Sequence, residues 1–391
     1  MIGSFQFAST PHIFFRNGKL NDLASIIRKY GASTLLLTGK QSFLKSERGN
    51  KFFDDLSRQG VGIEHLVISS EPSPEDIDNT VKTVGQTRIP VVVSIGGGSV
   101  IDAGKAISAM LYRSESVMDF LEGVGTKQHP GTKIPFIAVP TTSGTGSEAT
   151  KNAVISRTGI GGFKRSLRHD NFVPDMAIID PELTLHCPPE ITAASGMDCF
   201  TQLVESFLSD KASEYSDALA VEGLKALKGS LEKAYSSGSD ISARTGMSFA
   251  SLTSGICLAN AGLGAVHGFA SSIGGRYDIP HGVICGTLMA AANEINVRKL
   301  RERNEYQPAL RKYELLGRMF STEEGKSQDY YIDRFIDYLY ELTWKLDLPG
   351  LRTAGISEES IQGICAETEC KNNPVKLNPE DLEEILRKRF I

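Results

Sequence analysis

The sequence predicts an α/β nucleotide-binding domain over residues 1–185, with a parallel sheet and helices on both faces, followed by an all-α domain over residues 186–391. Short apolar runs alternate with helical patterns in the first half, and β-branched runs become sparse after about residue 190. Between them, the segment "DPELTLHCPPE" carries three prolines. A chain of 391 residues also exceeds what one hydrophobic core usually supports, which favours two domains.

The strands expected in the first half are "STLLLTG" (33–39), "IEHLVIS" (63–69) and the apolar "VVVSIG" before a glycine run. Helical spacing follows the first strand in "FLKSERGNKFFDDLSRQG". Helical spacing also follows the second strand, where Ser73, Pro74 and Glu75 form a helix-start signature. Strands that alternate with helices in this way are typical of a parallel sheet covered on both faces.

The second half has the apolar spacing of helices, as in "SDALAVEGLKALKGSLEKAYSS" (216–237). The last helix is clearly marked, because Asn378 can cap it and Pro379 occupies its first position. Two domains in one compact chain imply a cleft between them, where small-molecule sites usually form.

Composition and charge narrow the range of partners. The formal net charge is −5 and no run of like charges occurs, which argues against general affinity for nucleic acid or an anionic membrane. No window approaches the roughly 20 apolar residues that span a bilayer. The six cysteines are scattered without the spacing of a zinc finger or a disulfide framework, so we expect a reducing, cytoplasmic setting. The expected partner is a small molecule.

A glycine run marks the first candidate binding site. In "SIGGGSVID" (94–102) a strand ends in Gly96, Gly97 and Gly98, and Ser99 opens the next helix. Backbone N–H groups and the helix dipole at such a turn can cradle a phosphate. A purely structural turn remains an alternative, because the run does not match GxGxxG.

The second candidate is "VPTTSGTGSEAT" (139–150), a loop after the expected strand "IPFIAV". Most of its residues are Thr, Ser or Gly, so it offers hydroxyl groups and bare backbone that suit ribose and pyrophosphate oxygens. The alternative is a solvated linker.

The third candidate is a metal site. Asp198 and Gln202 are four residues apart and share one face of a helix. His267 is expected on a second helix and His281 at the start of a third. A carboxylate, an amide oxygen and two imidazoles would suit Zn(II) or Fe(II). Spacing alone leaves open that the two histidines are unrelated.

These stretches, taken in order, resemble the iron-containing (group III) alcohol dehydrogenase family, which has the dehydroquinate-synthase-like fold. The resemblance covers about residues 5 to 300, through "EPSPEDID", "SIGGGSVIDAGKAI", "VPTTSGTGSEAT", "AIIDPELTL", "ASGMDCFTQLVESFLS", "GLGAVHGFASSIGG" and "IPHGVICG". It implies that NAD(P) and an alcohol or aldehyde react across the cleft between an α/β domain and a helical domain. It also implies a homo-oligomer.

The resemblance also implies roles for individual residues. The residues matched to the cofactor are Gly97, Gly98, Ser99 and Asp102 in the pyrophosphate region, Thr141, Thr142 and Thr145 toward the nicotinamide half, and Lys164 as a cofactor contact. The residues matched to the divalent metal are Asp198, Gln202, His267 and His281.

Two positions depart from the family pattern. Gln202 stands where the family has His, and Ser271 stands where a second His usually follows the first by four residues. An amide oxygen is a neutral, harder ligand that could bind weakly or leave its position to water, which favours zinc over iron. A metal-free reductase similar to maleylacetate reductases is an alternative, with His267 and His281 acting directly on a carbonyl oxygen. A non-catalytic nucleotide-binding relative with a decayed metal site is another.

Two further residues bear on specificity. Gly39, followed by Lys40, stands where NAD-preferring relatives often place an acidic residue, so NADP is favoured and NAD stays open. Arg276 lies between the two candidate ligand histidines and could bind a carboxylate or phosphate of an acidic or sugar-derived substrate. A surface salt bridge is its alternative role. The sequence identifies no separate catalytic base.

Overall fold

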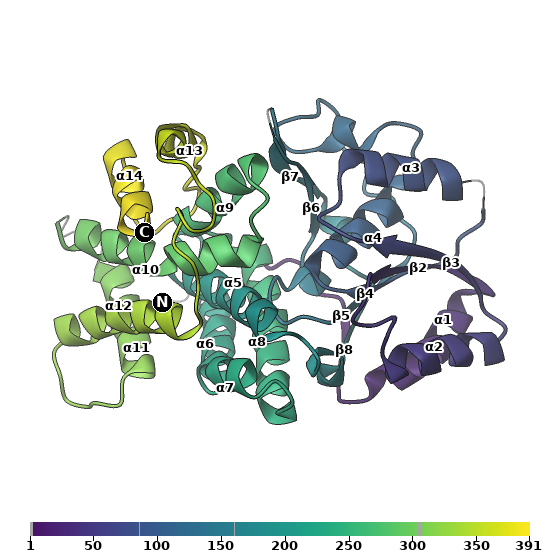
Figure 1. The fold of residues 1–391 in the computed structure, drawn as a ribbon, viewed down its shortest axis with the longest axis horizontal. Coiled ribbons are helices and arrows are strands. Elements are labelled where there is room, and N and C mark those ends of the chain that lie inside the picture. The colour runs from purple at the N-terminus through teal and green to yellow at the C-terminus, as the bar shows by residue number, and fades with distance from the viewer. Residues whose placement is uncertain (1–2, 86, 160, 303–306) are drawn as a thin grey trace.

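The computed structural model describes residues 3–85, 87–159, 161–302 and 307–391. An α/β unit, coloured purple to blue, lies beside a helical unit, coloured green to yellow (Figure 1). The predicted fold class is confirmed.

A parallel sheet of six strands forms the centre of the α/β unit, in the order β1-β8-β5-β4-β2-β3. The strands are β1 (His12–Phe15), β2 (Ser33–Gly39), β3 (Gly62–Ile68), β4 (Val92–Gly96), β5 (Phe136–Pro140) and β8 (Met176–Ile179). The observed β2 has the bounds that its apolar run predicted.

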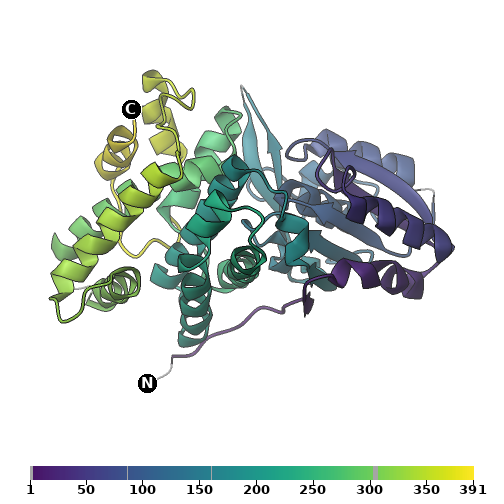
Figure 2. The ribbon, with the colours of Figure 1, turned by 60° about the horizontal axis from the view of Figure 1, so that its bottom comes forward.

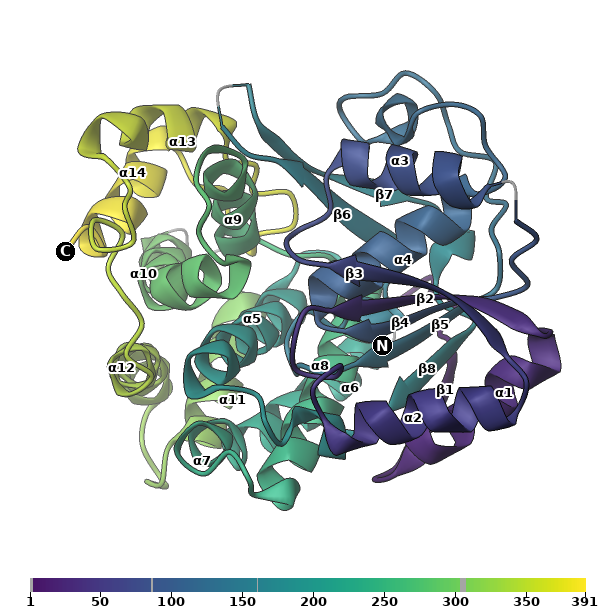
Figure 3. The same ribbon diagram turned by 45° about the vertical axis from the view of Figure 1, so that its right-hand side comes forward.

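Helices cover both faces of this sheet (Figure 3), namely α1 (Leu23–Tyr30), α2 (Glu47–Arg58), α3 (Pro74–Val84) and α4 (Gly98–Met110). Buried residues of β2 alternate between the two faces, since Leu35 and Leu37 pack with α4 while Leu36 packs with α1 and α2. Ser73 forms the predicted cap of α3, where its side chain accepts a hydrogen bond from Asp76 N–H.

The strand order places a topological switch point between β2 and β4. The chain passes outward from β2 to β3 and then returns to place β4 on the other side of β2. In open parallel sheets, ligands bind in the crevice beyond the carboxyl ends of strands at such a point. Gly39 and Gly96 end these two strands, so the sheet directs both toward one crevice.

An antiparallel hairpin, for which the sequence gave no expectation, extends from the sheet unit toward the helical unit. Its strands are β6 (Asn152–Arg157) and β7 (Phe163–Arg168), with Asn152 opposite Arg168. The hairpin lies between α4 and the helical unit (Figure 3).

The helical unit begins at Pro189, the last of the three prolines that separate the two halves of the sequence. Its helices are α5 (Pro189–Leu208), α6 (Glu214–Lys228), α7 (Leu231–Ser236), α8 (Ile241–Ala261), α9 (Ala265–Arg276), α10 (His281–Glu302), α11 (Gln307–Phe320), α12 (Gln328–Lys345), α13 (Ile361–Glu367) and α14 (Pro379–Lys388). The stretch 216–237 divides into α6 and α7 at Gly229, and Asn378 caps α14 as predicted.

The first residues of the chain pack on the helical unit before they enter the sheet (Figure 2). Ala8 N–H donates to Asn260 Oδ1 at 2.6 Å, and the ring centroid of Phe7 lies 4.8 Å from that of Tyr215. The two units are thus joined by this segment as well as by the connection before α5.

Among the described residues, no helix by itself has both the length and the apolar composition needed to cross a membrane. Only α8 and α9 taken together pass that test, with a bend of 97° between them.

The contact of α4 with the sheet provides a test of the fold. We expect Gly104→Ala to lower the free energy of unfolding by about 1–3 kcal/mol, because a Cβ there would lie 2.0 Å from Ser94 Oγ. Gly229→Ala is the matched control, since its backbone is right-handed (φ −80°) and a Cβ there meets open space. Chemical denaturation of both variants measures the difference, and equal stability would contradict this packing.

Candidate functional site

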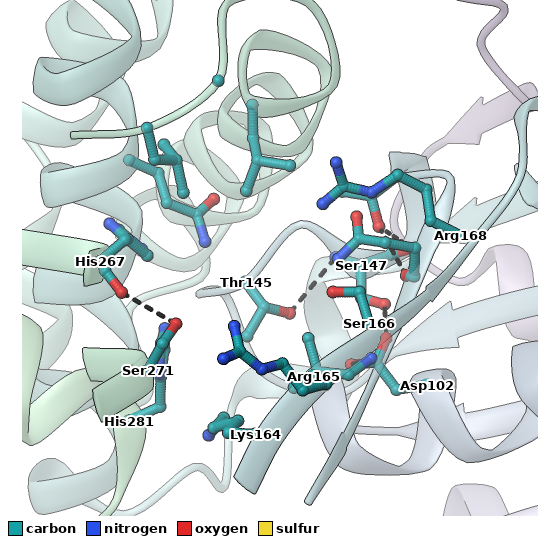
Figure 4. A pocket seen from close by; sticks show the side chains of 18 of the residues that line it. Asp102, Thr145, Ser147, Lys164, Arg165, Ser166, Arg168, His267, Ser271 and His281 are labelled. Carbon is teal, nitrogen blue, oxygen red and sulfur yellow. Dashed lines mark hydrogen bonds between the residues drawn. The ribbon is translucent and has the colours of Figure 1, made fainter. Parts of the chain in front are cut away.

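A cavity of about 580 Å³ lies between the α/β unit and the helical unit. Figure 4 shows His267 and His281 on the helical side, with Asp102, Ser147 and Arg168 on the opposite side. The predicted site residues that line the cavity are Gly98, Ser99, Asp102, Thr145, Lys164, Gln202, His267 and His281.

The glycine turn forms one end of this cavity. Gly97 precedes α4, and Gly98 and Ser99 begin it. The first N–H groups of a helix have no partner within the helix, and the helix dipole favours an anion there. A Cβ on Gly98 would lie 2.9 Å from Thr145 Cγ2, so glycine allows the turn and the neighbouring loop to lie in contact. The arrangement suits a pyrophosphate.

The loop 141–150 is wedged between the sheet and the helical unit. Gly146 has a φ of +60°, which favours glycine, and a Cβ on Gly255 of α8 would lie 2.1 Å from Gly146 O. A Cβ on Gly144 would likewise lie 2.7 Å from the Ser195 Cβ of α5. The glycines of this loop therefore permit a close approach between the two units, which excludes the solvated-linker alternative.

A buried lysine of α4 holds the loop on the sheet side. Lys105 Nζ donates to Ser147 O at 2.8 Å, to Thr150 Oγ1 at 2.9 Å and to Asn152 O at 2.8 Å. Burial lowers the pKa of Lys105 to about 8, partly offset by the carboxyl group of Asp102. Lys105 thus joins the start of the hairpin to the loop.

Asp102 acts within the same network. Its Oδ1 accepts a hydrogen bond from Ser147 Oγ, and its Oδ2 accepts one from Val154 N–H at 3.0 Å. Burial raises the pKa of this carboxyl group. Both oxygens are therefore engaged by the protein, and Asp102 contributes to the cavity wall by holding the loop and the hairpin together.

The other residues expected to contact the cofactor, Gly39, Gly97, Thr141 and Thr142, are not among the residues that line the large cavity. Thr141 and Thr142 line a separate pocket of about 80 Å³ between the sheet edge and the start of α5. Gly39 ends β2 at the switch point, and the following Lys40 is exposed.

Lys164 projects from β7 into the cavity wall beside His281. Its ammonium group forms an ion pair with Glu71, and Glu71 Oε2 also accepts a hydrogen bond from Ser156 Oγ at 2.9 Å. Lys164 is almost fully buried there. The side chain of Lys164 therefore packs against α9, where a Cβ on Gly274 would lie 3.1 Å from Lys164 Cδ.

Three of the predicted metal ligands meet on the helical side of the cavity. Asp198 Oδ1 lies 3.2 Å from His267 Nε2 and 3.7 Å from His281 Nε2. A fourth group, Cys285 of α10, joins them, and the four ligand atoms all lie within 4.8 Å of one another. Carboxylate, imidazole and thiol groups at this separation suit a divalent ion such as zinc.

The protonation of the cluster also fits a cation. Burial lowers the pKa of His281 to about 4, and the positive charge of Lys164 adds to this effect. Burial opposes ionisation of Asp198, but His281 and His267 outweigh that effect and lower its pKa. In the part of the chain that the structure describes, His281 Nδ1 is buried without a hydrogen-bond partner. A neutral imidazole beside an ionised carboxylate is the state that binds a metal.

For His267, burial disfavours the charged ring, but contacts with Cys285, Asp198 and Glu205 outweigh it and raise the pKa. A bound cation would supply the positive charge that these groups otherwise draw from a proton.

Gln202 lies beside the cluster and lines the cavity. Its Oε1 accepts a hydrogen bond from Ser254 Oγ of α8 at 3.0 Å. Ser271 Oγ donates to the backbone oxygen of His267 at 3.0 Å, so this hydroxyl is also engaged within the protein.

Glu205 is a site residue that the sequence analysis did not identify. Its Oε2 lies 2.7 Å from His267 Nδ1, and its Oε1 accepts a hydrogen bond from Val266 N–H at 2.7 Å. An ionised carboxylate only accepts, so Nδ1 carries a proton, and in the neutral ring Nε2 is then left to bind a metal. The signal was available, since Glu205 follows Asp198 by two helical turns. Cys285 likewise follows His281 by one turn.

Arg276 lies at the end of α9 and forms a salt bridge with Glu367 of α13. Its Nε lies 3.1 Å from Glu367 Oε2, and a second guanidinium nitrogen contacts Oε1. Glu367 lines the cavity. The structure thus places Arg276 in the salt bridge that was its alternative role, with its partner facing the cavity.

Comparison with known proteins identifies the class. A family model described as iron-containing alcohol dehydrogenase matches residues 10–181, and one for the C-terminal part of the Fe-containing alcohol dehydrogenase family matches residues 192–390. The chain therefore belongs to the iron-containing alcohol dehydrogenase family and is an oxidoreductase that acts on CH–OH groups. The match also extends the resemblance beyond residue 300.

Individual relatives agree. Long-chain-alcohol dehydrogenase 1 of Geobacillus thermodenitrificans is 34% identical over 68% of this chain and 67% of its own length. Alcohol dehydrogenase 4 of Saccharomyces cerevisiae is 29% identical over 97% of both chains. Among solved structures, an archaeal halo-thermophilic alcohol dehydrogenase from a Red Sea brine pool has a TM-score of 0.88 at 27% identity, covering 100% of this chain and 99% of that one.

The contact of Glu205 with His267 yields a test of the metal cluster. In Glu205→Gln the oxygen can still accept from Val266 N–H, but the amide then presents N–H to His267 Nδ1. The ring proton must move to Nε2, which faces Asp198. We expect metal affinity to fall by about 10–100-fold, as measured by competition with a chelator. Glu367→Gln is the control, and equal affinities for wild type and Glu205→Gln would contradict this role.

Proposed function

We propose that this protein is a metal-dependent, NAD(P)-linked alcohol dehydrogenase or aldehyde reductase. Hydride would pass between a nicotinamide ring and the carbon of a small alcohol or aldehyde. The observation that carries the proposal is the grouping of Asp198, His267 and His281 across one cavity from the glycine turn at the switch point. When bound, the divalent ion supplies Lewis acidity and the nicotinamide supplies hydride chemistry.

The α/β unit would bind and orient the nucleotide. N–H groups at the start of α4 face the cavity beside Thr145, where they suit pyrophosphate oxygens. Thr141 and Thr142 form the wall of the smaller pocket next to this turn. Both sites lie beyond the carboxyl ends of neighbouring strands, β4 and β5, so one extended ligand could contact both.

The helical unit would hold the reacting group of the substrate. Asp198 is buried beneath the cavity, while His267 and His281 form part of its surface. The three would bind the divalent ion, with Gln202 or water beside it. Neutral imidazoles hold such an ion without cancelling its charge. Residues of the hairpin line the cavity and would limit the access of water to the region between nucleotide and substrate.

The substrate class we propose includes alcohols and aldehydes with an acidic or sugar-derived group. The cationic side chains that line the cavity are Lys151, Lys164, Arg165, Arg168 and Lys371. Several of them have exposed carboxylate partners, as in the 3.8 Å pair of Arg165 with Glu369. A substrate carboxylate or phosphate could replace such a partner. Arg276 would contribute only if it left Glu367.

The first experiment measures metal content by inductively coupled plasma mass spectrometry. We expect about one zinc or iron per chain in the wild type and its loss in His267→Ala. The variant would keep only two of the three proposed ligands, and zinc sites in proteins use at least three. Turnover of NAD(P)H with an aldehyde should fall by more than about 100-fold, since altering a ligand's outer partner already costs 10–100-fold.

His12→Ala, at an exposed histidine of β1, is the control and should keep both metal and activity. Turnover by a wild-type protein without metal would instead favour a metal-free reductase. Nucleotide binding without any turnover would favour a non-catalytic relative.

Cofactor preference is tested at the end of β2. We propose NADP as the preferred cofactor, because Gly39 and Lys40 leave room and a positive charge for a 2′-phosphate. Gly39→Asp should lower kcat/KM for NADP relative to NAD by at least about 10-fold, since a carboxylate repels the phosphate and binds the ribose 2′-hydroxyl. Steady-state kinetics with both cofactors measures the ratio, and Asn21→Asp, on the distant η1 (Lys19–Asp22), is the control. An unchanged ratio would place the ribose elsewhere.

A further inference from the structure

We propose that Cys285 is a protein ligand of the metal and takes the place of the imidazole that this chain lacks at Gln202. The inference rests on the metal-dependent function proposed above and changes the expected ligand set. That set becomes one carboxylate, two imidazoles and one thiolate, from Asp198, His267, His281 and Cys285.

The position of Cys285 in its helix is the first argument. His281 opens α10, and Cys285 follows it by one turn on the same helical face. Cys285 is fully buried, and its Sγ lies 3.8 Å from His267 Nε2 and within 4.8 Å of the ligand atoms of Asp198 and His281. The sulfur therefore points into the cluster.

The distances are the second argument. Ligand atoms around a tetrahedral zinc lie about 3.3 to 3.6 Å apart when Zn–N is about 2.0 Å and Zn–S is about 2.3 Å. In this structure the corresponding separations are 3.2 Å from Asp198 to His267, 3.7 Å from Asp198 to His281 and 3.8 Å from Cys285 to His267. All the separations among the four atoms lie within 4.8 Å, so rotations of the four side chains could enclose an ion.

The hydrogen bond and the neutral charge of Gln202 are the third argument. Its Oε1 accepts a hydrogen bond from Ser254 Oγ, and a neutral amide contributes less than an imidazole to holding a cation. Gln202 also lines the cavity, whereas Cys285 lies behind the cluster in the core of the helical unit. A thiolate ligand at the back leaves the cavity side of the ion open to a substrate oxygen.

The donor set has a chemical consequence. Uptake of the ion displaces the thiol proton to solvent, so the bound state carries two anionic ligands. Thiolate is a soft ligand that favours zinc and is shared by the Cys₂His site of zinc alcohol dehydrogenases. The site should therefore retain zinc in preference to iron when both are supplied.

Cobalt substitution tests the proposal. The protein is stripped of metal, reloaded with Co(II) and examined by absorption spectroscopy, where a thiolate ligand gives an intense near-ultraviolet charge-transfer band. We expect the band in wild type and in Gln202→Ala, and its loss in Cys285→Ser with cobalt still bound. Cys257→Ser is the matched control, because Cys257 is an equally buried thiol on α8.

The outcomes separate this inference from the proposed function. Cobalt bound by wild type without the band, or a band that survives in Cys285→Ser, overturns the thiolate ligand but keeps the metal site. Failure of wild type to bind cobalt overturns the metal dependence itself, and this inference with it. If Cys285→Ser does not fold, X-ray absorption of the wild-type zinc protein decides, since one sulfur at about 2.3 Å is expected and only nitrogen and oxygen neighbours would contradict it.

Discussion

The close backbone contact between Gly146 and Gly255 sets how the α/β unit and the helical unit meet. A Cβ on Gly255 would lie 2.1 Å from Gly146 O, so no larger residue fits there without separating the units. The cavity lies beside this contact, with the glycine turn on one wall and the candidate metal ligands on the other. The distance between the glycine turn and the candidate metal ligands therefore depends on this contact. Lys105 of α4 fixes the position of the loop that contains Gly146, because it donates hydrogen bonds to Ser147 and Thr150 of that loop.

The parallel sheet explains why binding residues from distant parts of the sequence converge. Adjacent parallel strands end at the same edge, so Gly39, the turn after β4 and the loop after β5 reach one crevice. The hairpin of β6 and β7 then covers that crevice and brings Lys164 next to His281. The sheet unit thus supplies one side of the cavity, with the glycine turn, and α5, α9 and α10 supply the other side, with the candidate metal ligands.

Local patterns in the sequence were enough to predict most of the fold. The Leu run of residues 33–39, the Ser73 cap and the Asn378 cap each depend on neighbouring residues only, and each is observed. Asp198, His267 and His281 were placed by resemblance, and the structure brings them together. Glu205 and Cys285 were missed because a helical period gives the face on which a residue lies, but not which helix packs against that face. The β6–β7 hairpin was missed because the apolar run of β6 is only three residues long and β7 is mostly polar.

The charges around the cluster explain why each histidine must be held in a particular form. Lys164 and burial together keep His281 neutral, with a pKa of about 4, although Asp198 lies 3.7 Å away. Glu205 binds the Nδ1 proton of His267 and leaves its Nε2 facing Asp198. Each imidazole thus has one nitrogen near the carboxylate, and at His267 a bound cation would take the place of the proton that raises its pKa. When buried acceptor atoms face one another and have no donor between them, a bound cation is favoured at that place.

The exchange of a family histidine for Gln202 removes one neutral metal ligand. A thiolate from Cys285 would restore the number of ligands and add a negative charge. On this proposal, the glutamine of α5 and the cysteine of α10 would be two parts of a single change in the metal site.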